Sequence, residues 1–410
     1  MEALLEKIRK QLKPDTVVLK QVDEAVEDIN SLLKKNKLKA ECVKGGSVAK
    51  GTFLKGDFDV DLFVRFDYSY KDKDLSKLLE KALKPLKPEL VHGSRDYFQI
   101  KNKDKLVFEI VPVLKINDYK KALNVTDMSP LHVFYVEKHL REKPELAEDI
   151  RLAKQFCKAN KVYGAESYIK GFSGHVLDIL IIYYGSFEQL LMQASVWGDR
   201  VILDPEKHLE DPLKALNKAK THSPLIIVDP IQPDRNAAAA LSRERFELFK
   251  EAAKKFLHKP SNDFFNIKKL DVNKIKTKET LLVVTATPLK GKDDVVATKL
   301  LKVFEKLNTA LKKHDFKVLE SDWEYSKKTV MYFVVKKERM SDTVEVIGPP
   351  VKQKTDAKRF RSKHKKVFEK NNRLFAVEKR EFKEPLTLLK DHIKKSYINE
   401  KVSAIKCSKR

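Results

Sequence analysis

Residues 45–64 constrain this chain more than any other part of its sequence. They read GGSVAKGTFLKGDFDVDLFV, a glycine-containing turn followed by alternating polar and apolar residues. Alternation with β-branched and aromatic residues predicts a strand over residues 58–66. Gly45 and Gly46 let the backbone approach a triphosphate closely, and the Ser47 hydroxyl and free amides can donate hydrogen bonds to its phosphate oxygens. The turn is not a Walker A loop, because no G-x-x-x-x-G-K-S/T pattern follows.

Two aspartates of the predicted strand form a candidate metal site. Asp59 and Asp61 are two residues apart, so both side chains point to one face and can grip one or two hard cations. Asp57 continues the alternation, but it follows Gly56 and is expected in the turn. An Asp-x-Asp pair alone more often lines a solvated strand face. The Gly-Gly-Ser turn before it favours the metal site.

A third carboxylate, Glu109, lies inside the apolar run LVFEIVPV of residues 106–113. Burying an unpaired charge there would be costly, so Glu109 needs a partner. A salt bridge to Lys or Arg is one reading. A role beside the two aspartates, binding the metal that activates an attacking hydroxyl, is the reading we favour.

The turn, the aspartate pair and the distal glutamate resemble the DNA polymerase β nucleotidyltransferase superfamily. Two later segments narrow the resemblance: YGAESYIKGFSGH at 163–175 and VDPIQPDRNAAAAL at 228–241. Both are similar to central-domain signatures of archaeal-type (class I) CCA-adding enzymes. With the sequence SPLH at 129–132, the resemblance covers roughly residues 40–260.

The resemblance implies roles for particular residues. The implied metal ligands, with Mg²⁺ as the cofactor, are Asp59, Asp61 and Glu109, and the implied nucleotide-binding residues are Gly46, Ser47, Lys50, His132, Lys154, Tyr163 and Arg235. Ser47 and Lys50 would contact the triphosphate, and Arg235 would read the base. Judged alone, His132, Lys154 and Tyr163 are more ordinary as packing or surface residues. This chain has Lys50 where the family often has Arg, and Glu109 where Asp is commoner; lysine loses the bidentate fork of arginine.

The expected architecture is an α+β multidomain protein. The resemblance implies a polymerase β-like head with a mixed sheet and helices over residues 1–143, a mainly helical neck and body over 144–265, and an α+β body and tail over 266–410. Periodicity predicts head strands at 91–101 and 106–116, and helices at 146–159 and at 176–184, the latter capped by Ser173. It also predicts strands at 281–286, 316–323 and 330–335 around a helix at 295–313.

Charge points to a polyanionic partner. The chain has 84 Lys and Arg against 59 Asp and Glu, a net charge of +25, with a dense basic stretch at 352–370. A solvated Lys-rich surface is the plainer reading, and a charge of this size favours nucleic acid. Three cysteines without C-x-x-C spacing predict neither disulfides nor zinc. No apolar run of eighteen residues occurs, so no membrane association and a cytoplasmic location are expected.

The expected function is addition of C, C and A to the tRNA 3′ end from CTP and ATP, by two-metal nucleotidyl transfer without a nucleic-acid template. The implied partner is the tRNA acceptor arm, and a homodimer through the basic C-terminal region stays open. The alternatives are another polymerase β-like RNA-terminal transferase, of the poly(A) polymerase or oligoadenylate synthetase type, or a noncatalytic RNA-binding protein on that scaffold.

Overall fold

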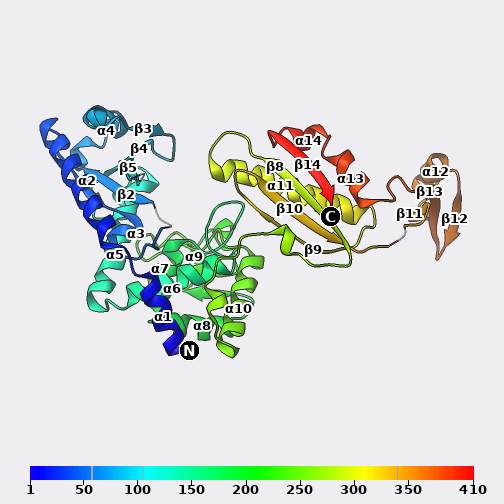
Figure 1. Ribbon diagram of the computed structural model, residues 1–410, viewed down its shortest axis with the longest axis horizontal. Helices are drawn as coiled ribbons and strands as arrows, with labels where there is room; N and C mark the ends of the chain where they lie inside the picture. The colour runs from blue at the N-terminus through cyan, green and yellow to red at the C-terminus, as the bar shows by residue number, and fades with distance from the viewer. Residues whose placement is uncertain (57–58, 105, 339) are drawn as a thin grey trace. The chain divides into compact units, whose positions relative to one another are not determined.

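The computed structural model describes residues 1–56, 59–104, 106–338 and 340–410 (Figure 1). Asp57, the alternative member of the aspartate pair, lies outside the described residues. The chain forms two compact units, Met1–Ile267 and Lys268–Arg410. Both units combine helices with sheets, which confirms the α+β class. The further division of the first unit at residue 143 stays a prediction.

A five-stranded mixed sheet, here called the head sheet, organises the first part of the chain. Its strands are, in spatial order, β1 (Ala40–Lys44), β2 (Val60–Phe66), β5 (Val107–Leu114), β4 (Tyr97–Lys101) and β3 (Glu89–Val91). Only β2 and β5 pair in parallel; the other neighbours are antiparallel. Helices α2 (Thr16–Lys35) and α4 (Leu75–Leu83) bury their apolar residues with those of the sheet (Figure 1).

The predicted continuous strand at 91–101 is wrong. The structure has the hairpin β3–β4 instead, because residues 92–96 read HGSRD and form a turn. Gly, Ser and Asp are residues that favour turns over strand interiors. The predicted strands at 58–66 and 106–116 correspond to β2 and β5 in their described parts.

Helices dominate the rest of the first unit. They are α1 (Glu2–Leu12), α5 (Ser129–Glu142), α6 (Leu146–Ala159), α7 (Gly174–Tyr184), α8 (Phe187–Ser195), α9 (Pro212–Ala215) and α10 (Arg243–His258), with a small parallel pair of β6 (Val201–Leu203) and β7 (Leu225–Ile227). Phe156 lies at the centre, with its ring centroid 5.6 Å from Phe187 and 5.9 Å from Phe256. The predicted cap is confirmed, since the Ser173 side chain accepts a hydrogen bond from the backbone of Val176.

Helix α1 packs in this helical core, although the predicted head boundaries include it. Leu5 and Ile8 are buried among the core residues of α6 and α7. Arg9 forms an ion pair of 3.1 Å with the buried Asp149 of α6. The amphipathic face of α1 therefore stabilises the helical part of the unit rather than the head sheet.

The second unit is built on the sheet β14 (Ala404–Lys409), β8 (Thr280–Thr287), β10 (Thr329–Val335) and β9 (Val318–Glu324), in that order. Helix α11 (Asp293–Lys313) shares the core of one face with α13 (Pro385–His392), and α14 (Ser396–Asn399) precedes β14. The predicted helix at 295–313 and the three predicted strands are confirmed within a few residues.

A second, three-stranded sheet lies within this unit and was missed by the sequence reading. Its order is β11 (Thr343–Pro350), β13 (Arg373–Lys379) and β12 (Val367–Lys370), with α12 (Lys354–Lys363) inserted before β12. These strands carry charged residues and prolines, and most of their residues are exposed or half-buried. The alternation of a buried strand is therefore weak in them.

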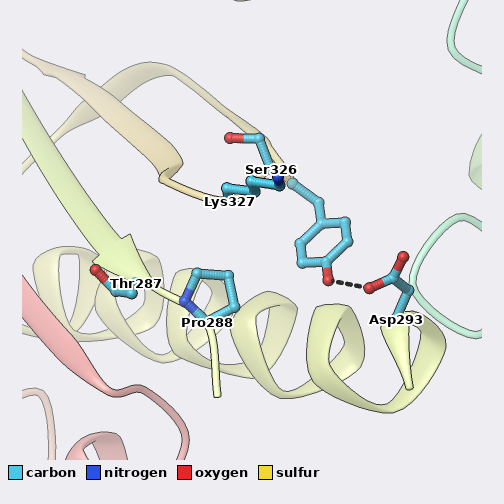
Figure 2. A pocket seen from close by; sticks show the side chains of 6 residues that line it. Thr287, Pro288, Asp293, Ser326 and Lys327 are labelled. Atoms are coloured by element: carbon cyan, nitrogen blue, oxygen red, sulfur yellow. Dashed lines mark hydrogen bonds between the residues drawn. The ribbon is translucent and has the colours of Figure 1, made fainter. Parts of the chain in front are cut away.

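A cavity of about 440 Å³ opens beside the end of β8 (Figure 2). The Tyr325 hydroxyl donates a 2.7 Å hydrogen bond to Asp293 Oδ1 there, fastening the β9–β10 turn to the first turn of α11. Among the described residues, no helix has the length and apolarity that crossing a bilayer requires.

Replacing Leu5 with Ala should lower the free energy of unfolding by about 2–5 kcal/mol, because a fully buried side chain is removed from the helical core. Denaturant unfolding followed by circular dichroism measures the change. Lys7→Ala, an exposed position on the same helix, is the control and should shift it by less than about 0.5 kcal/mol. Equal effects of the two variants would contradict the packing of α1.

Candidate functional site

Three carboxylates share one face of the head sheet. Strand β2 pairs in parallel with β5 so that Asp61 is the partner of Glu109, and Asp59 lies two residues before Asp61. All three line a cavity of about 580 Å³. Gln99, the partner of Glu109 on β4, donates a 2.7 Å hydrogen bond from its Nε2 to Glu109 Oε1. The register of the sheet therefore gathers the carboxylates and orients one of them.

The double glycine is required by close packing against Asp61. The Gly45 N–H donates to the Asp61 carbonyl at 2.7 Å, and the one-turn helix α3 (Gly46–Ala49) follows. Gly46 has a φ of +51°, and a Cβ there would lie 1.8 Å from Asp61 Oδ2. A side chain at residue 46 would thus displace the aspartate. From the sequence, the glycines were expected to allow the approach of a phosphate, and their contact with Asp61 was missed. Ser47 lines the cavity beside this contact.

Burial and neighbouring charges raise the pKa values of two carboxylates in this cluster. Burial, and then the charges of Glu109 and Asp59, raise the pKa of Asp61 to about 6. Burial and the charge of Asp59 also raise the pKa of Glu109, against the opposing hydrogen bond from Gln99. Clustered carboxylates that resist ionisation are stabilised by a divalent cation, for which carboxylate oxygens are suitable ligands. The donor set therefore fits a divalent metal.

Another part of the cavity lining, here called the basic wall, is basic and aromatic. Lys154 of α6 is buried and donates 3.0 Å hydrogen bonds from Nζ to the carbonyl and hydroxyl oxygens of Thr52. Burial lowers the pKa of Lys154 to about 8. Lys158 Nζ lies 4.7 Å from the ring centroid of Tyr163, and both residues line the cavity. A polyanion bound there would therefore meet both carboxylate and ammonium groups.

Lys50 lies outside this cavity. Its ammonium forms an ion pair with Asp178 of α7, and both side chains are buried. It lines a neighbouring hollow with Glu137 and Arg141. The predicted contact of Lys50 with the triphosphate stays a prediction, and in the structure Asp178 is the partner of its charge.

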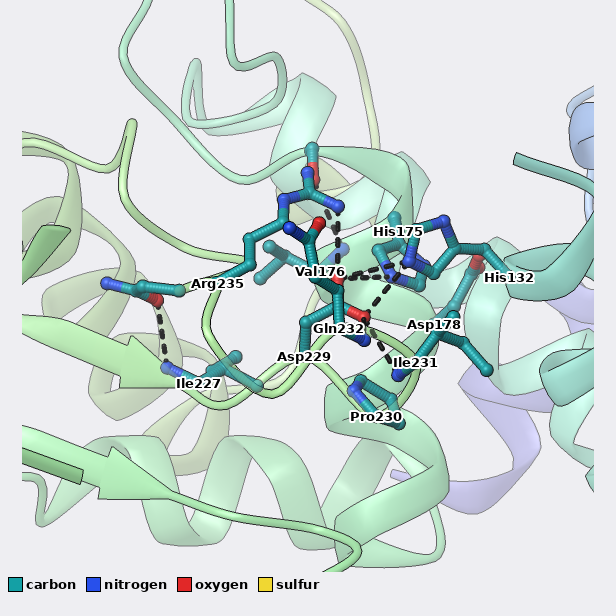
Figure 3. A network of polar contacts seen from close by, with 12 residues as sticks. His132, His175, Val176, Asp178, Ile227, Asp229, Pro230, Ile231, Gln232 and Arg235 are labelled. Atoms are coloured by element: carbon teal, nitrogen blue, oxygen red, sulfur yellow. Dashed lines mark hydrogen bonds and ion pairs between the residues drawn. The ribbon is translucent and has the colours of Figure 1, made fainter. Parts of the chain in front are cut away.

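A second polar group gathers around the fully buried Asp229 (Figure 3). His132 Nε2 lies 3.0 Å from Asp229 Oδ1, and Arg235 donates to Asp229 Oδ2 at 3.0 Å. The rings of His132 and His175 pack with centroids 4.4 Å apart. Burial acts to raise the pKa of Asp229, but the hydrogen bond from His132 and the nearby ring of His175, 3.6 Å away, hold that pKa far below the usual range.

His132, His175 and Asp229 also offer ligand atoms within 4.8 Å of one another. The Asp229 oxygens, however, already accept from Arg235 and from the backbone N–H groups of Ile231 and Gln232. The charge of the Asp229 carboxylate is therefore compensated by Arg235 without a metal ion.

The predicted site residues thus fall into separate groups. One cavity is lined by Ser47, Asp59, Asp61, Glu109, Lys154 and Tyr163, with Gly46 packed behind Asp61. His132 and Arg235 meet at Asp229, and Lys50 meets Asp178. Sequence reasoning missed Gln99, Asp178, His175 and Asp229. Asp178 could have been recognised as a single charged residue in an apolar helix. Nothing in the sequence identifies Gln99, because its role depends on the strand register.

The fold and the acidic cavity define this chain as a nucleotidyltransferase. A family model described as the nucleotidyltransferase domain matches residues 23–124, and one for the second domain of tRNA nucleotidyltransferase matches 148–266. A model of the C-terminal domain of the CCA-adding enzyme matches residues 277–404. The chain belongs to the CCA-adding enzyme family, as the resemblance in its sequence predicted.

Relatives cover nearly the whole chain. It is 34% identical over 373 residues to the CCA-adding enzyme of Nanoarchaeum equitans (strain Kin4-M), covering 90% of this chain and 91% of the relative. It is 30% identical over 394 residues to that of Saccharolobus islandicus (strain Y.G.57.14 / Yellowstone #1), covering 95% and 91%. Among solved structures, Cid1 poly(U) polymerase shares the fold, with a TM-score of 0.53 and 13% identity over 64% of this chain and 98% of that chain.

Binding of a divalent cation should weaken as the pH falls through about 6, because protonated Asp61 cannot donate to a metal. Below that pH the affinity should fall by up to about tenfold per pH unit for one competing proton. Calorimetric titration with Mn²⁺ between pH 5 and 7.5 measures this affinity. Asp61→Asn should bind Mn²⁺ weakly and without this pH step. Equal wild-type affinity at pH 5 and 7 would be the contrary result.

Proposed function

We propose that this chain adds C, C and A, in that order, to the 3′ end of tRNA from CTP and ATP without a nucleic-acid template. The observation that carries the proposal is one cavity that is lined by Asp59, Asp61 and Glu109 and also by Lys154 and Tyr163. Such a cavity suits a nucleoside triphosphate whose α-phosphate lies near the carboxylates. The family to which the chain belongs identifies the accepting RNA.

Mg²⁺ is the proposed cofactor, held by Asp59, Asp61 and Glu109. When bound, Mg²⁺ would lower the pKa of the attacking 3′-hydroxyl and neutralise charge on the triphosphate. The chain's own residues hold the metal-binding carboxylates in place. Gly45 holds the Asp61 backbone, and Gln99 holds one oxygen of Glu109. No protein nucleophile is required, because the tRNA hydroxyl attacks the α-phosphate in line and pyrophosphate leaves.

The triphosphate is proposed to lie between Ser47 and the basic wall. The Ser47 hydroxyl can donate to a phosphate oxygen, and Lys154 and Lys158 supply positive charge where the pyrophosphate forms. Because Lys154 is buried, its charge is poorly screened by solvent and acts strongly at short range. Tyr163, with its ring beside Lys158, would pack against the ribose.

Base selection is assigned to Arg235. The Arg235 side chain is 42% exposed, and its guanidinium has further donors besides the one bonded to Asp229. Such donors match acceptors on cytosine and adenine, and a mismatched base would leave them unpaired, which discriminates strongly.

The acceptor arm of tRNA is proposed to bind through A-form phosphates and 2′-hydroxyls, since duplex RNA presents little sequence to side chains. The net charge of +25 supports this assignment. Helix α12 and its flanking strands concentrate that charge: residues 343–379 hold eleven Lys and Arg against four Asp and Glu.

Labelled CTP and ATP, given separately and together, should extend tRNA transcripts that end before C, CC or CCA until CCA is complete, and then stop. Asp61→Ala should lose at least about a thousandfold of the rate, because it removes a carboxylate that holds the metal. Product length on sequencing gels measures both. Long A tails would instead identify a poly(A)-type transferase, and metal-independent binding without addition would leave only an RNA-binding protein.

Arg235→Ala should blur the choice of CTP over UTP, and of ATP over GTP, by about tenfold or more, because the base loses its donor. The rate of pyrophosphate release with the correct nucleotide should fall less. Single-nucleotide incorporation with each of the four triphosphates measures the ratios. Unchanged selectivity would remove Arg235 from base reading.

A further inference from the structure

The Asp229 carboxylate accepts hydrogen bonds from two side chains and from two backbone N–H groups. It follows β7 and Val228, and its side chain is fully buried. Its two oxygens accept from His132 at 3.0 and 3.2 Å, from the backbone N–H groups of Ile231 at 2.9 Å and Gln232 at 3.1 Å, and from Arg235 at 3.0 Å, while His175 lies 3.6 Å away. Figure 3 shows these side chains converging on the carboxylate.

The same residue fixes the backbone from which Arg235 projects. The Asp229 N–H donates to the Arg235 carbonyl at 3.0 Å, closing the turn. The buried Asn236 that follows accepts from the backbone of Ile227 at 2.9 Å and of Ala238 at 2.9 Å. Both ends of the turn are therefore pinned, and Arg235 leaves it in one direction.

A half-exposed arginine would otherwise sample many rotamers and would lose side-chain entropy when it is ordered. The bond to Asp229 orders the guanidinium in advance and leaves its other donors available. Pre-ordered donors discriminate better than mobile ones, because a mobile arginine can adapt to the wrong base.

The carboxylate also joins three elements of the fold. His132 comes from α5, His175 from α7 and Arg235 from the turn after β7, and all three meet at Asp229. Because His132 and Arg235 share this carboxylate, the position of one side chain is coupled to that of the other.

We propose that Asp229 is a positioning residue for base selection, whose carboxylate aims the Arg235 guanidinium and ties it to His132. The proposal rests on the proposed function, in which Arg235 reads the base. Asp229 itself is buried beneath these three side chains and touches no substrate. Selectivity for C and A thus depends on a residue that does not contact the base.

The test is single-nucleotide incorporation by Asp229→Asn and Asp229→Glu, with all four triphosphates, beside Arg235→Ala. Both Asp229 variants should lose at least about tenfold in selectivity and less in the rate with the correct nucleotide. The double variant of Asp229→Asn with Arg235→Ala should be no less selective than Arg235→Ala alone, because the two residues act through one contact.

Asp234→Asn is the matched control. Asp234 is an exposed carboxylate in the same turn, pairs with Lys220 at 3.6 Å and should leave selectivity unchanged. If Arg235→Ala loses selectivity while both Asp229 variants keep it, the positioning role is overturned. If Arg235→Ala keeps it, the proposed function of Arg235 fails instead, so the two failures are distinguishable.

A measurement on protein that keeps Asp229 tests the proposal even if the Asp229 variants do not fold. In ¹⁵N-arginine-labelled protein, with the Arg235 signal assigned by its loss in Arg235→Ala, the guanidinium should rotate slowly because of its bond to Asp229. Free rotation, as in an exposed arginine, would overturn the proposal.

Discussion

The parallel pairing of β2 with β5 places Asp61 beside Glu109, and the site is arranged around the repulsion between them. Burial is the main cause of the raised pKa of both residues, with the charge of Glu109 adding to the shift of Asp61 and the charge of Asp59 adding to the shifts of both. Gly46 packs so closely against Asp61 that a side chain there would collide with the carboxylate, and Gln99 holds Glu109 in place. The fold therefore keeps an unfavourable arrangement that a divalent cation makes favourable.

Contacts between the loop after α3 and the helices α6 and α7 bring the basic wall into the same cavity as these carboxylates. Residues 50–52 are bonded in succession: Lys50 to Asp178, the Gly51 carbonyl to Arg151 at 2.6 Å, and Thr52 to Lys154 at 3.0 Å. All three partners belong to α6 or α7 and are buried. Burial makes each contact strong and makes an unpaired partner costly, so the loop after α3 has one well-defined position.

Sequence alone predicted much of this arrangement and missed the rest for physical reasons. The Gly-Gly-Ser turn with Asp59 and Asp61 is local, and its spacing revealed both elements. Glu109 was detectable as a charge in an apolar run, but its position beside Asp61 depends on strand register. Asp229 collects donors from α5, α7 and a turn, which no local pattern can reveal. Strands β11 to β13 were missed because charged residues obscure their alternation.

The central claim is that Asp59, Asp61 and Glu109 together hold the metal at which the triphosphate reacts. Crystals grown with Mn²⁺ and CTP test it directly, because anomalous scattering locates manganese without assumptions about the chemistry. The account predicts anomalous peaks among these three carboxylates, with the triphosphate running from them toward Ser47 and Lys154. Manganese bound only between His132, His175 and Asp229, with the three carboxylates empty, would contradict it.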